Sequence, residues 1–224
     1  MDNEHAIKTI SIIGGTGALG KGLALRWARA GYRIIIGSRS DARAQETVTR
    51  LCTELTNPTI TGSVNPDAAR DGDIVVMTVP YAHHQSTLED IRAGLAGKIL
   101  VDTTVPLVPP KVARVQLPAE GSAAVRAQRI LGEKVQVVSA FHNIAAELMA
   151  TDQKPECDVL IAGDKFASRQ EVITLAEKAG FRAWHAGPLA NSAAMEALTS
   201  VLIFMNKRYE GSHTGIRITG ITNH

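Results

Sequence analysis

The chain has 224 residues, of which 45% are hydrophobic and 21% are charged, and its formal net charge is +2. This length accommodates one full α/β domain with a small addition, and the apolar content is sufficient for a real core. The basic residues are dispersed rather than clustered among aromatic side chains, so we expect no nucleic-acid partner.

The cysteines and the N-terminal residues indicate the compartment. Cys52 and Cys157 belong to no C-x-x-C pair, which argues against a disulfide scaffold or a zinc site and fits reduced thiols in the core. Residues 1–5 are polar and acidic, and the apolar run after them is too short for a secretion signal or a membrane span. We therefore expect a cytoplasmic protein that has no membrane partner.

Residues 9–43 have the pattern of a strand, a turn, a helix and a second strand. A strand is predicted over 9–13, a glycine-rich turn over 14–20, a helix whose apolar residues recur every four positions, and a parallel strand over 33–36. A G-x-G-x-x-G sequence in this setting is typical of dinucleotide binding. The alternative, an ordinary glycine-rich turn without a ligand, is disfavoured by the unit as a whole.

Each glycine of this motif has a physical role. Gly15 permits the tight turn off the strand, and Gly17 has no side chain to obstruct a pyrophosphate that approaches the backbone. Gly20 lets the helix lie close to the sheet. The phosphates would bind free N–H groups at the positive end of that helix.

The end of the second strand predicts which nucleotide binds. An NAD site would place Asp or Glu here to accept from the ribose 2′-hydroxyl, but this chain has Ser38 and Arg39, with Arg43 one helical turn further on. A guanidinium fork and a serine hydroxyl can hold a 2′-phosphate, which a carboxylate would repel. The alternative is a solvated helix start in which Asp41 neutralises part of the charge, and the balance favours NADP(H).

Helices and strands then alternate. We expect a helix over 43–55, a strand over 59–61, a helical turn with Asn65 as its cap, and a nearly continuous apolar strand over 73–79. In an open α/β sheet the carboxyl end of this last strand lies beside the dinucleotide and can line its nicotinamide side. The candidates at this strand end are Thr78, Val79 and Pro80.

The next predicted helix, over 83–96, opens with two adjacent histidines. The side chains of His83 and His84 point about 100° apart on a helix and cannot chelate one metal ion well, so we expect a solvated or capping role and no metal site. After a strand over 98–102, the prolines of 105–110 exclude a helix and a central strand. A loop of this kind at the carboxyl edge of a sheet is either a substrate lip or a surface crossover.

A further histidine follows the next strand. A helix is predicted over 122–131 and a strand over 134–139, and His142 stands just past the strand end between apolar neighbours. It could donate to a ring nitrogen or a carbonyl of a bound substrate. It could equally be a packed histidine whose N–H binds a backbone carbonyl, and the spacing leaves both readings open.

The C-terminal part repeats the alternation. We expect a strand over 159–163, a helix over 168–179, a strand over 182–185 and a helix over 192–208 that Asn191 and Ser192 cap. The last helix is apolar around most of its circumference, which predicts burial on several sides and more apolar surface than one small domain can cover. We therefore expect a homodimer held largely by this helix. The tail, 211–224, is expected to return over the site.

These elements predict an α/β fold of the Rossmann type, with a doubly wound, mostly parallel sheet and a small C-terminal helical appendage. We divide the chain into an NADP-binding Rossmann domain, 1–139, and a smaller C-terminal α/β part, 140–224. No convincing Ser-His-Asp or metal-ligand constellation is present in the sequence.

Together the motifs resemble one family, the NADPH-dependent reductases of coenzyme F420, also called F420H2:NADP oxidoreductases. The matching segments keep the family's order and extend over nearly the whole chain. They are 14–26 (GGTGALGKGLALR), 36–39 (IGSR), 78–80 (TVP), 105–109 (VPLVP), 139–142 (SAFH) and 186–192 (AGPLANS).

This resemblance implies direct hydride transfer between C4 of the nicotinamide and C5 of the deazaflavin, with no nucleophile or metal. It also implies that 140–224 completes the deazaflavin pocket and the dimer interface, and that 214–218 approach this pocket. The residues implied to contact the dinucleotide are Thr16, Ala18, Leu19, Ser38, Arg39, Arg43, Val79 and Pro80. Those implied to border the deazaflavin are His142 and Ile144.

Two other functions are compatible with the sequence. An NADPH-dependent imine reductase of the pyrroline-carboxylate type has a similar nucleotide half, but it needs a larger helical C-terminal domain than the residues after Pro188 provide. A non-catalytic NADP(H) sensor would have its deazaflavin pocket closed or filled by side chains.

Overall fold

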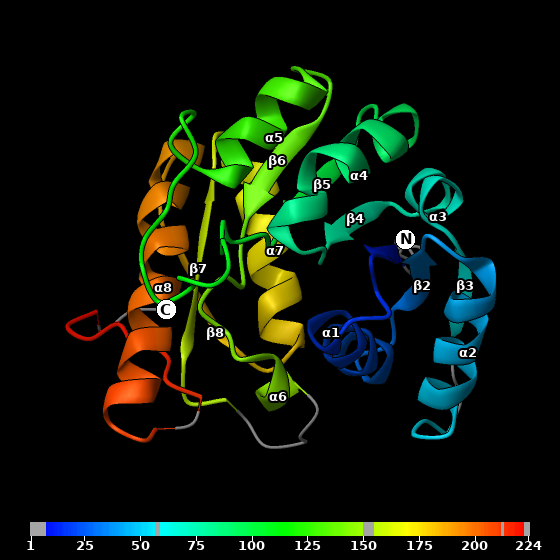
Figure 1. Cartoon of the computed structure of the whole chain (residues 1–224). Helices are drawn as coiled ribbons and strands as arrows, with labels where there is room; N and C mark the ends of the chain where they lie inside the picture. The colour runs from blue at the N-terminus through cyan, green and yellow to red at the C-terminus, as the bar shows by residue number, and fades with distance from the viewer. Residues whose placement is uncertain (1–7, 57–58, 150–154, 212, 222–224) are drawn as a thin grey trace.

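The computed structural model describes residues 8–56, 59–149, 155–211 and 213–221 (Figure 1). The strands are β1 Thr9–Ile13, β2 Arg33–Ser38, β3 Ile60–Val64, β4 Ile74–Met77, β5 Ile99–Asp102, β6 Gln136–Ser139, β7 Asp158–Gly163 and β8 Arg182–His185. The α-helices are α1 Ala18–Arg29, α2 Asp41–Cys52, α3 Asn65–Asp71, α4 His84–Ile91, α5 Ala123–Leu131, α6 Ala146–Met149, α7 Phe166–Lys178 and α8 Ser192–Arg208. Short 3₁₀ helices are η1 Tyr81–His83, η2 Arg92–Gly94 and η3 Leu189–Asn191.

The strands form one sheet in the order β3-β2-β1-β4-β5-β6-β7-β8. Neighbouring strands are parallel except β6 and β7, where Val138 lies opposite Gly163 in an antiparallel pair. The strand order reverses between β1 and β4, and in open α/β sheets ligands bind beyond the carboxyl ends of the strands at such a point. The doubly wound, mostly parallel α/β sheet that the sequence predicts is thus confirmed.

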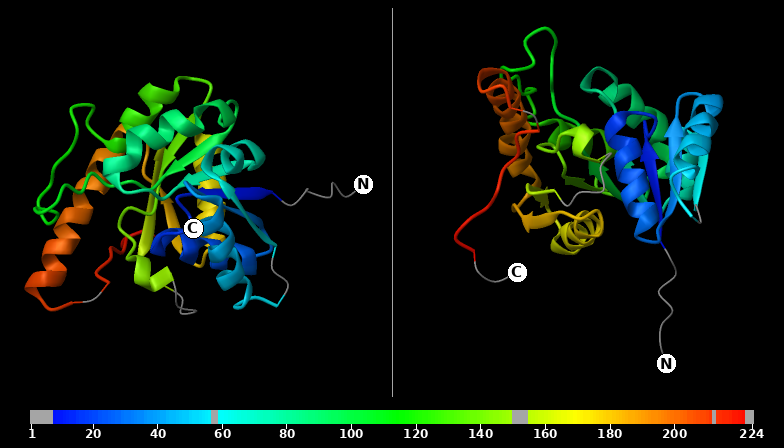
Figure 2. Two further views of the ribbon diagram at one scale, coloured as in Figure 1. Left: turned by 45° about the vertical axis from the view of Figure 1, so that its right-hand side comes forward. Right: turned by 90° about the horizontal axis from the view of Figure 1, so that it is seen from below.

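Alternate residues of the strands belong to two cores, one on each face of the sheet. Ile10 and Ile12 of β1 belong to the core with α1, α2 and α7, whereas Ile13 belongs to the core with α3, α4 and α5. Helices accordingly cover both faces (Figures 1 and 2). Because strand side chains alternate between faces, a strand covered on both sides must be apolar throughout, as the runs in the sequence are.

Helix α1 joins the N-terminal and C-terminal parts of the chain. The indole N–H of Trp27 donates to the Leu175 carbonyl of α7 over 2.8 Å. The guanidinium of Arg26 donates to the Ala179 carbonyl (2.8 Å) and to the Leu148 carbonyl of α6 (3.1 Å). The predicted division of the chain after β6 stays a prediction, because the sheet and the core continue across it.

Some local predictions differ from the structure. Asn65 does not cap α3 with its side chain, and its Oδ1 accepts the Gly14 N–H instead (3.3 Å). The helix predicted over 83–96 is divided into η1, α4 and η2. Asn191 forms no cap hydrogen bond to α8, and its amide donates to the Ala186 carbonyl (2.6 Å). Helix α6 was not predicted, because so short a helix carries no periodicity to recognise.

The tail returns onto β7 rather than over the cleft described below. The Asp158 N–H donates to the Ile216 carbonyl (2.8 Å), and the Ile218 N–H donates to the Asp158 carboxylate (2.7 Å). Arg182 binds the same carboxylate and also the Ile218 carbonyl. The ordered return is confirmed, but its expected place over the site is wrong for the described residues 213–221. Residues 212 and 222–224 lie outside the described part.

Helix α8 buries only one side within the chain. Met195 and Leu202 are buried, whereas Val201 is 44% and Phe204 is 55% exposed. The predicted burial on several sides is therefore wrong for a single chain. None of the described helices, α8 included, is long and apolar enough to cross a membrane.

A buried carboxyl group connects α8 to α5. Glu196 is 1% exposed, and its oxygens accept the N–H groups of Ala123 (2.6 Å) and Ala124 (3.1 Å) at the start of α5. The hydroxyls of Ser122 and Ser192 lie 2.6 Å apart in the same contact. Burial raises the pKa of Glu196 to about 8, although the two N–H donors oppose this change. The carboxyl group is therefore largely protonated at neutral pH.

We expect this carboxyl group to make the stability depend on pH. Its pKa is 4.5 without perturbation and about 8 in the folded chain, so its contribution is complete below 4.5 and is lost as the pH rises through 8. Urea unfolding should show a loss of about 1 kcal/mol per pH unit between pH 6.5 and 7.5. Glu196→Gln cannot titrate and should lose less over the same interval. Equal losses in both proteins would show that Glu196 is already ionised.

Candidate active site

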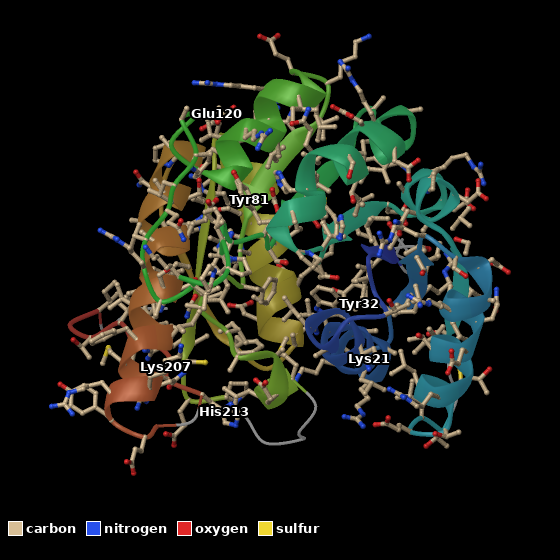
Figure 3. The ribbon with its side chains drawn as sticks, in the orientation of Figure 1. Lys21, Tyr32, Tyr81, Glu120, Lys207 and His213 are labelled. Atoms are coloured by element: carbon tan, nitrogen blue, oxygen red, sulfur yellow. The ribbon has the colours of Figure 1, made fainter. Side chains whose placement is uncertain are left out.

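A cleft of about 710 Å³ opens at the carboxyl ends of the central strands, and α8 contributes Thr199 to its wall. Its lining residue Tyr81 lies in the upper central part of the view in Figure 3, above Lys21 on α1 and Lys207 on α8. Gly15 and Gly20 are not part of the lining. The predicted residues that line it are Thr16, Gly17, Ala18, Leu19, Ser38, Arg39, Arg43, Thr78, Val79, Pro80, His142 and Ile144.

The glycine turn is held under one end of the cleft. The Gly15 N–H donates to the carbonyls of Ile12 (3.1 Å) and Gly37 (2.9 Å). A Cβ on Gly20 would lie 2.7 Å from the Gly15 Cα, so only glycine lets α1 approach the turn this closely. The residue with a positive φ is Gly14, at 71°, rather than Gly15. The predicted packing role of Gly20 agrees with this geometry.

The N-terminus of α1 borders the same end of the cleft. Gly17 stands at the cap position without a side chain, and the first turn contains no acidic residue. A Cβ on Gly17 would meet no atom closer than 3.6 Å, so the backbone is open to a ligand. The N–H groups of Ala18 and Leu19 belong to the first turn, where a helix has no internal acceptors. Such a helix end can bind a phosphate group.

Two exposed guanidinium groups follow the end of β2. Arg39 and Arg43 line the cleft, and neither side chain forms a hydrogen bond or an ion pair with the described residues. The alternative reading is a solvated helix start in which Asp41 neutralises part of this charge. Asp41 instead accepts a hydrogen bond from the Gln45 amide (3.4 Å). Ser38 precedes them at the buried end of the strand. Among the described residues, the lining of the cleft contains these positive charges and no carboxylate, which suits a phosphate on the ribose.

The ends of β4 and β5 form the next part of the wall. The Thr78 hydroxyl donates to the Ile13 carbonyl (3.1 Å), and the Thr103 hydroxyl donates to the Met77 carbonyl (2.9 Å). Both hydroxyls are thus engaged by the sheet. The apolar Val79 remains as a surface against which a flat ring can pack, as predicted for this strand end.

His142 is buried, and its ring has no hydrogen-bond partner among the described residues. Its side chain is 5% exposed and lines the cleft, and both Nδ1 and Nε2 are unpaired. The reading in which its N–H binds a backbone carbonyl is therefore wrong. Burial lowers the pKa of His142 to about 4, although the charge of Asp102 opposes this change. The ring is neutral at pH 7 and offers one donor and one acceptor to a ligand.

The turn that carries His142 is shaped by the core. Phe141 has φ of 65°, and its buried ring contacts the rings of Trp27 and Phe181 edge to face, each with centroids 6.1 Å apart. A positive φ outside glycine costs about 1–3 kcal/mol and persists only where packing determines it. This packing sets the path of the turn, along which His142 and Ile144 reach the cleft.

Sequence reasoning missed a buried pair beneath the cleft. His84 Nε2 lies 2.7 Å from Asp102 Oδ2, and both side chains are fully buried. The predicted solvated or capping role is therefore wrong for His84, whereas His83 is exposed. An Asp that ends an apolar strand is the available signal, because a buried carboxylate requires a partner. The described part of the chain contains no group of three His, Cys, Asp or Glu side chains that could hold a metal ion.

The proline-rich connection after β5 combines the two roles that the sequence left open. Val105 and Leu107 line the cleft, which fits a substrate lip. Val108 is exposed, and the connection continues beside α8 toward α5 (Figures 1 and 2). Its first residues belong to the site, and the remainder is a surface crossover.

The fold and the cleft place this chain among the dinucleotide-binding α/β proteins of the Rossmann type. A family model described as NADP oxidoreductase, coenzyme F420-dependent, matches residues 9–106. The F420-dependent NADP reductase of Methanocaldococcus jannaschii is 40% identical over 221 residues, which are 95% of this chain and 98% of the relative. The chain belongs to the family of F420-dependent NADP reductases.

Solved structures show the same fold. A structure from Arthrobacter sp. FB24 matches with a TM-score of 0.79 and 24% identity, over 96% of this chain and all of that one (100%). The imine reductase of Bacillus cereus matches with a TM-score of 0.62 and 18% identity, over 91% of this chain but only 63% of its own.

Proposed function

We propose that this chain is an enzyme that transfers a hydride between NADP(H) and coenzyme F420. The observation that carries the proposal is the continuity of one cleft from the glycine turn to the unpaired ring of His142. One end has the features of a dinucleotide site, and the other end has room and polar groups for a second ring. Membership of the F420-dependent NADP reductase family supports the same reading.

The dinucleotide would lie along the glycine turn and the ends of β2 and β4. Its pyrophosphate would bind the N-terminus of α1, where Gly17 leaves the backbone open. Arg39 and Arg43 would hold the 2′-phosphate together with the hydroxyl of Ser38. Val79 and Pro80 would pack against the nicotinamide, which places the reacting carbon toward the end of β5.

The second ring would lie at the ends of β5 and β6. NADPH and F420 supply the hydride donor and acceptor when bound, so the chain needs no nucleophile. Its residues orient the two rings, whose reacting carbons must come within about 3–3.5 Å. Ile144 and His142 border this position, and the neutral imidazole can hydrogen-bond a ring without changing its charge. Orientation should therefore matter more than the titration of any side chain.

Both alternative functions are disfavoured. A sensor would have a closed or filled second pocket, but the cleft is open beside His142 and Ile144. The 40% identity to the F420-dependent NADP reductase of Methanocaldococcus jannaschii, over 98% of that relative, favours an F420 reductase over an imine reductase.

Replacing Ile144 tests the hydride transfer. Ile144→Trp would fill the space of the second ring, so it should abolish F420 reduction and leave NADPH binding nearly intact. His142→Ala should lower the rate only partly, because the ring orients and does not react. The rate is measured as loss of the visible absorbance of F420 on adding NADPH, with Ile144→Val as the matched control.

The wild-type protein decides between the functions in the same assay. If NADPH binds tightly and the F420 absorbance does not change, the sensor reading holds. If a cyclic imine is reduced while F420 is not, the imine-reductase reading holds.

Replacing Arg39 tests the nucleotide preference. A charge-assisted hydrogen bond to a phosphate contributes about 1.5–3 kcal/mol. Arg39→Asp should therefore weaken the use of NADPH tenfold or more and spare NADH, as shown by kcat/KM for each nucleotide. Arg92→Asp on η2, outside the cleft lining, makes the same charge change and should affect neither nucleotide selectively. Equal losses for both nucleotides in Arg39→Asp would mean that Arg39 supports the fold instead.

We further propose a homodimer held largely by α8. The exposed side of this helix carries Val201, Phe204 and Met205, and Tyr209 follows at its end. Exposed apolar surface of this kind marks interfaces in soluble proteins. A second copy that presents the same helix would cover it about a twofold axis.

Charge on this side of α8 should separate the subunits. The double change of Val201 and Met205 to Glu should yield monomers or insoluble protein, because the carboxylates would be buried at the interface. Light scattering coupled to size-exclusion chromatography gives the mass. Phe166→Glu, at an exposed phenylalanine of α7, should leave the mass unchanged. A native mass of one chain for the unmodified protein contradicts the proposal.

A cytoplasmic location accords with this function. Cys52 and Cys157 are free thiols, and Cys157 is buried. Free thiols of this kind persist in a reducing compartment. We propose that the enzyme works there on its two soluble coenzymes.

A further inference from the structure

The floor of the cleft contains polar atoms that no described residue satisfies. The Thr104 hydroxyl has no hydrogen-bond partner of acceptable geometry, and neither ring nitrogen of His142 has one. Thr104 is 2% and His142 is 5% exposed, and both line the cleft. Buried polar side chains in folded proteins are nearly always hydrogen-bonded, and an unpaired group costs about 1–3 kcal/mol. Unpaired groups that meet in a cleft indicate a ligand that pairs with them.

The two side chains belong to neighbouring strand ends. Asp102 of β5 lies opposite Ser139 of β6 in the parallel register, and the Ala140 N–H donates to the Asp102 carbonyl (3.2 Å). Thr104 and His142 come shortly after these paired residues, so both emerge at the same edge of the sheet. The two unpaired groups thus border the same part of the cleft.

The buried pair beneath the cleft holds Thr104 in place. Asp102 Oδ1 accepts the Thr104 N–H (2.9 Å), while Oδ2 binds His84 Nε2 (2.7 Å). Burial favours protonation of Asp102, but the charge and hydrogen bond of His84, with help from Thr104, outweigh it and lower the pKa of Asp102. The Thr104 hydroxyl is close enough to the Asp102 carboxylate to help lower this pKa. Its oxygen can still accept a hydrogen bond from a ligand. Thr104 is therefore a positioned group and not a loose side chain.

The adjacent residue, Thr103, provides a comparison for Thr104, because its hydroxyl has a structural role. The Thr103 hydroxyl donates to the Met77 carbonyl (2.9 Å), so its hydrogen atom is already engaged within the sheet. Thr104 differs from it in having no such partner. A hydroxyl and a neutral imidazole together offer donors and acceptors that match a carbonyl group beside an N–H group.

We propose that Thr104 and His142 form a polar subsite that binds the carbonyl–amide edge of one reacting ring, and that the Asp102–His84 pair positions this subsite. This inference rests on the proposed function. Two rings have such an edge: the nicotinamide, in its carboxamide, and the deazaflavin, in its pyrimidinedione. Holding the edge prevents the ring from rotating in its plane, which keeps the reacting carbon at hydride-transfer distance.

Isosteric variants of Thr104 test the subsite through binding alone. Thr104→Val removes the hydroxyl and keeps the shape, whereas Thr104→Ser keeps the hydroxyl. Dissociation constants are measured for NADPH, for F420, and for 2′-phospho-ADP-ribose, which lacks the nicotinamide. Loss of one such hydrogen bond should weaken binding about three- to tenfold. Thr104→Ser should bind all three ligands nearly as well as the wild type.

The pattern of loss identifies the ring. Weaker NADPH binding with unchanged 2′-phospho-ADP-ribose and F420 binding assigns the subsite to the nicotinamide carboxamide. Weaker F420 binding with unchanged NADPH binding assigns it to the deazaflavin. Unchanged binding of all ligands, an equal loss for all three, or a loss in Thr104→Ser that matches Thr104→Val would overturn the proposal.

Two controls keep the test decisive. Thr59→Val removes a hydroxyl outside the cleft lining that donates to the Tyr32 carbonyl (2.8 Å), so it should leave the binding of all three ligands unchanged. Thr104→Ala replaces Thr104→Val if the latter does not fold, with the same outcomes expected. Wild-type protein that reduces F420 with NADPH, while Thr104→Val binds all ligands normally, overturns only the subsite. Wild-type protein that does not reduce F420 overturns the proposed function.

Discussion

The close approach of α1 to the end of β1 is the constraint on which the rest of the structure depends. Gly20 can lie against Gly15 only because neither residue has a side chain. The same helix then presents its N-terminus to the cleft, and its other end carries Trp27, which binds the Leu175 carbonyl of α7. One helix thus presents its N-terminal N–H groups to the cleft and connects this end of the cleft to the C-terminal half of the sheet. A shift of α1 would disturb both the glycine-turn end of the cleft and the core that supports His142.

The cleft combines a hydrogen-bonded framework with a few unpaired polar groups. Asp102 is buried and engaged on both oxygens, by His84 and by the Thr104 N–H. Above it, neither ring nitrogen of His142 has a partner among the described residues, and the Thr104 hydroxyl forms no hydrogen bond of acceptable geometry. Unpaired buried groups reduce the free energy of unfolding, and the bonded framework beneath them keeps their positions defined. A ligand that satisfies them gains hydrogen bonds without having to reorganise the protein.

The electrostatics suit a reaction in which the coenzymes carry the charge changes. Burial keeps the His142 ring neutral at pH 7 and keeps Glu196 largely protonated. Positive charge is concentrated instead at Arg39 and Arg43, where a phosphate would bind. The cleft thus has an ionic end, at Arg39 and Arg43, and a neutral end, at His142.

The sequence by itself determined the local features: the strands, the glycine turn, the basic group at Arg39 and Arg43, and the strand ends that line the cleft. These follow from short-range periodicity and from backbone demands that particular residues meet. Only the tertiary structure decided which distant groups pair. His84 with Asp102, Asn65 with the Gly14 N–H, the antiparallel β7 and the unpaired ring of His142 all depend on contacts between separate elements. Hydrophobic periodicity indicates whether a residue faces the core, but it does not indicate which group forms a hydrogen bond with its side chain.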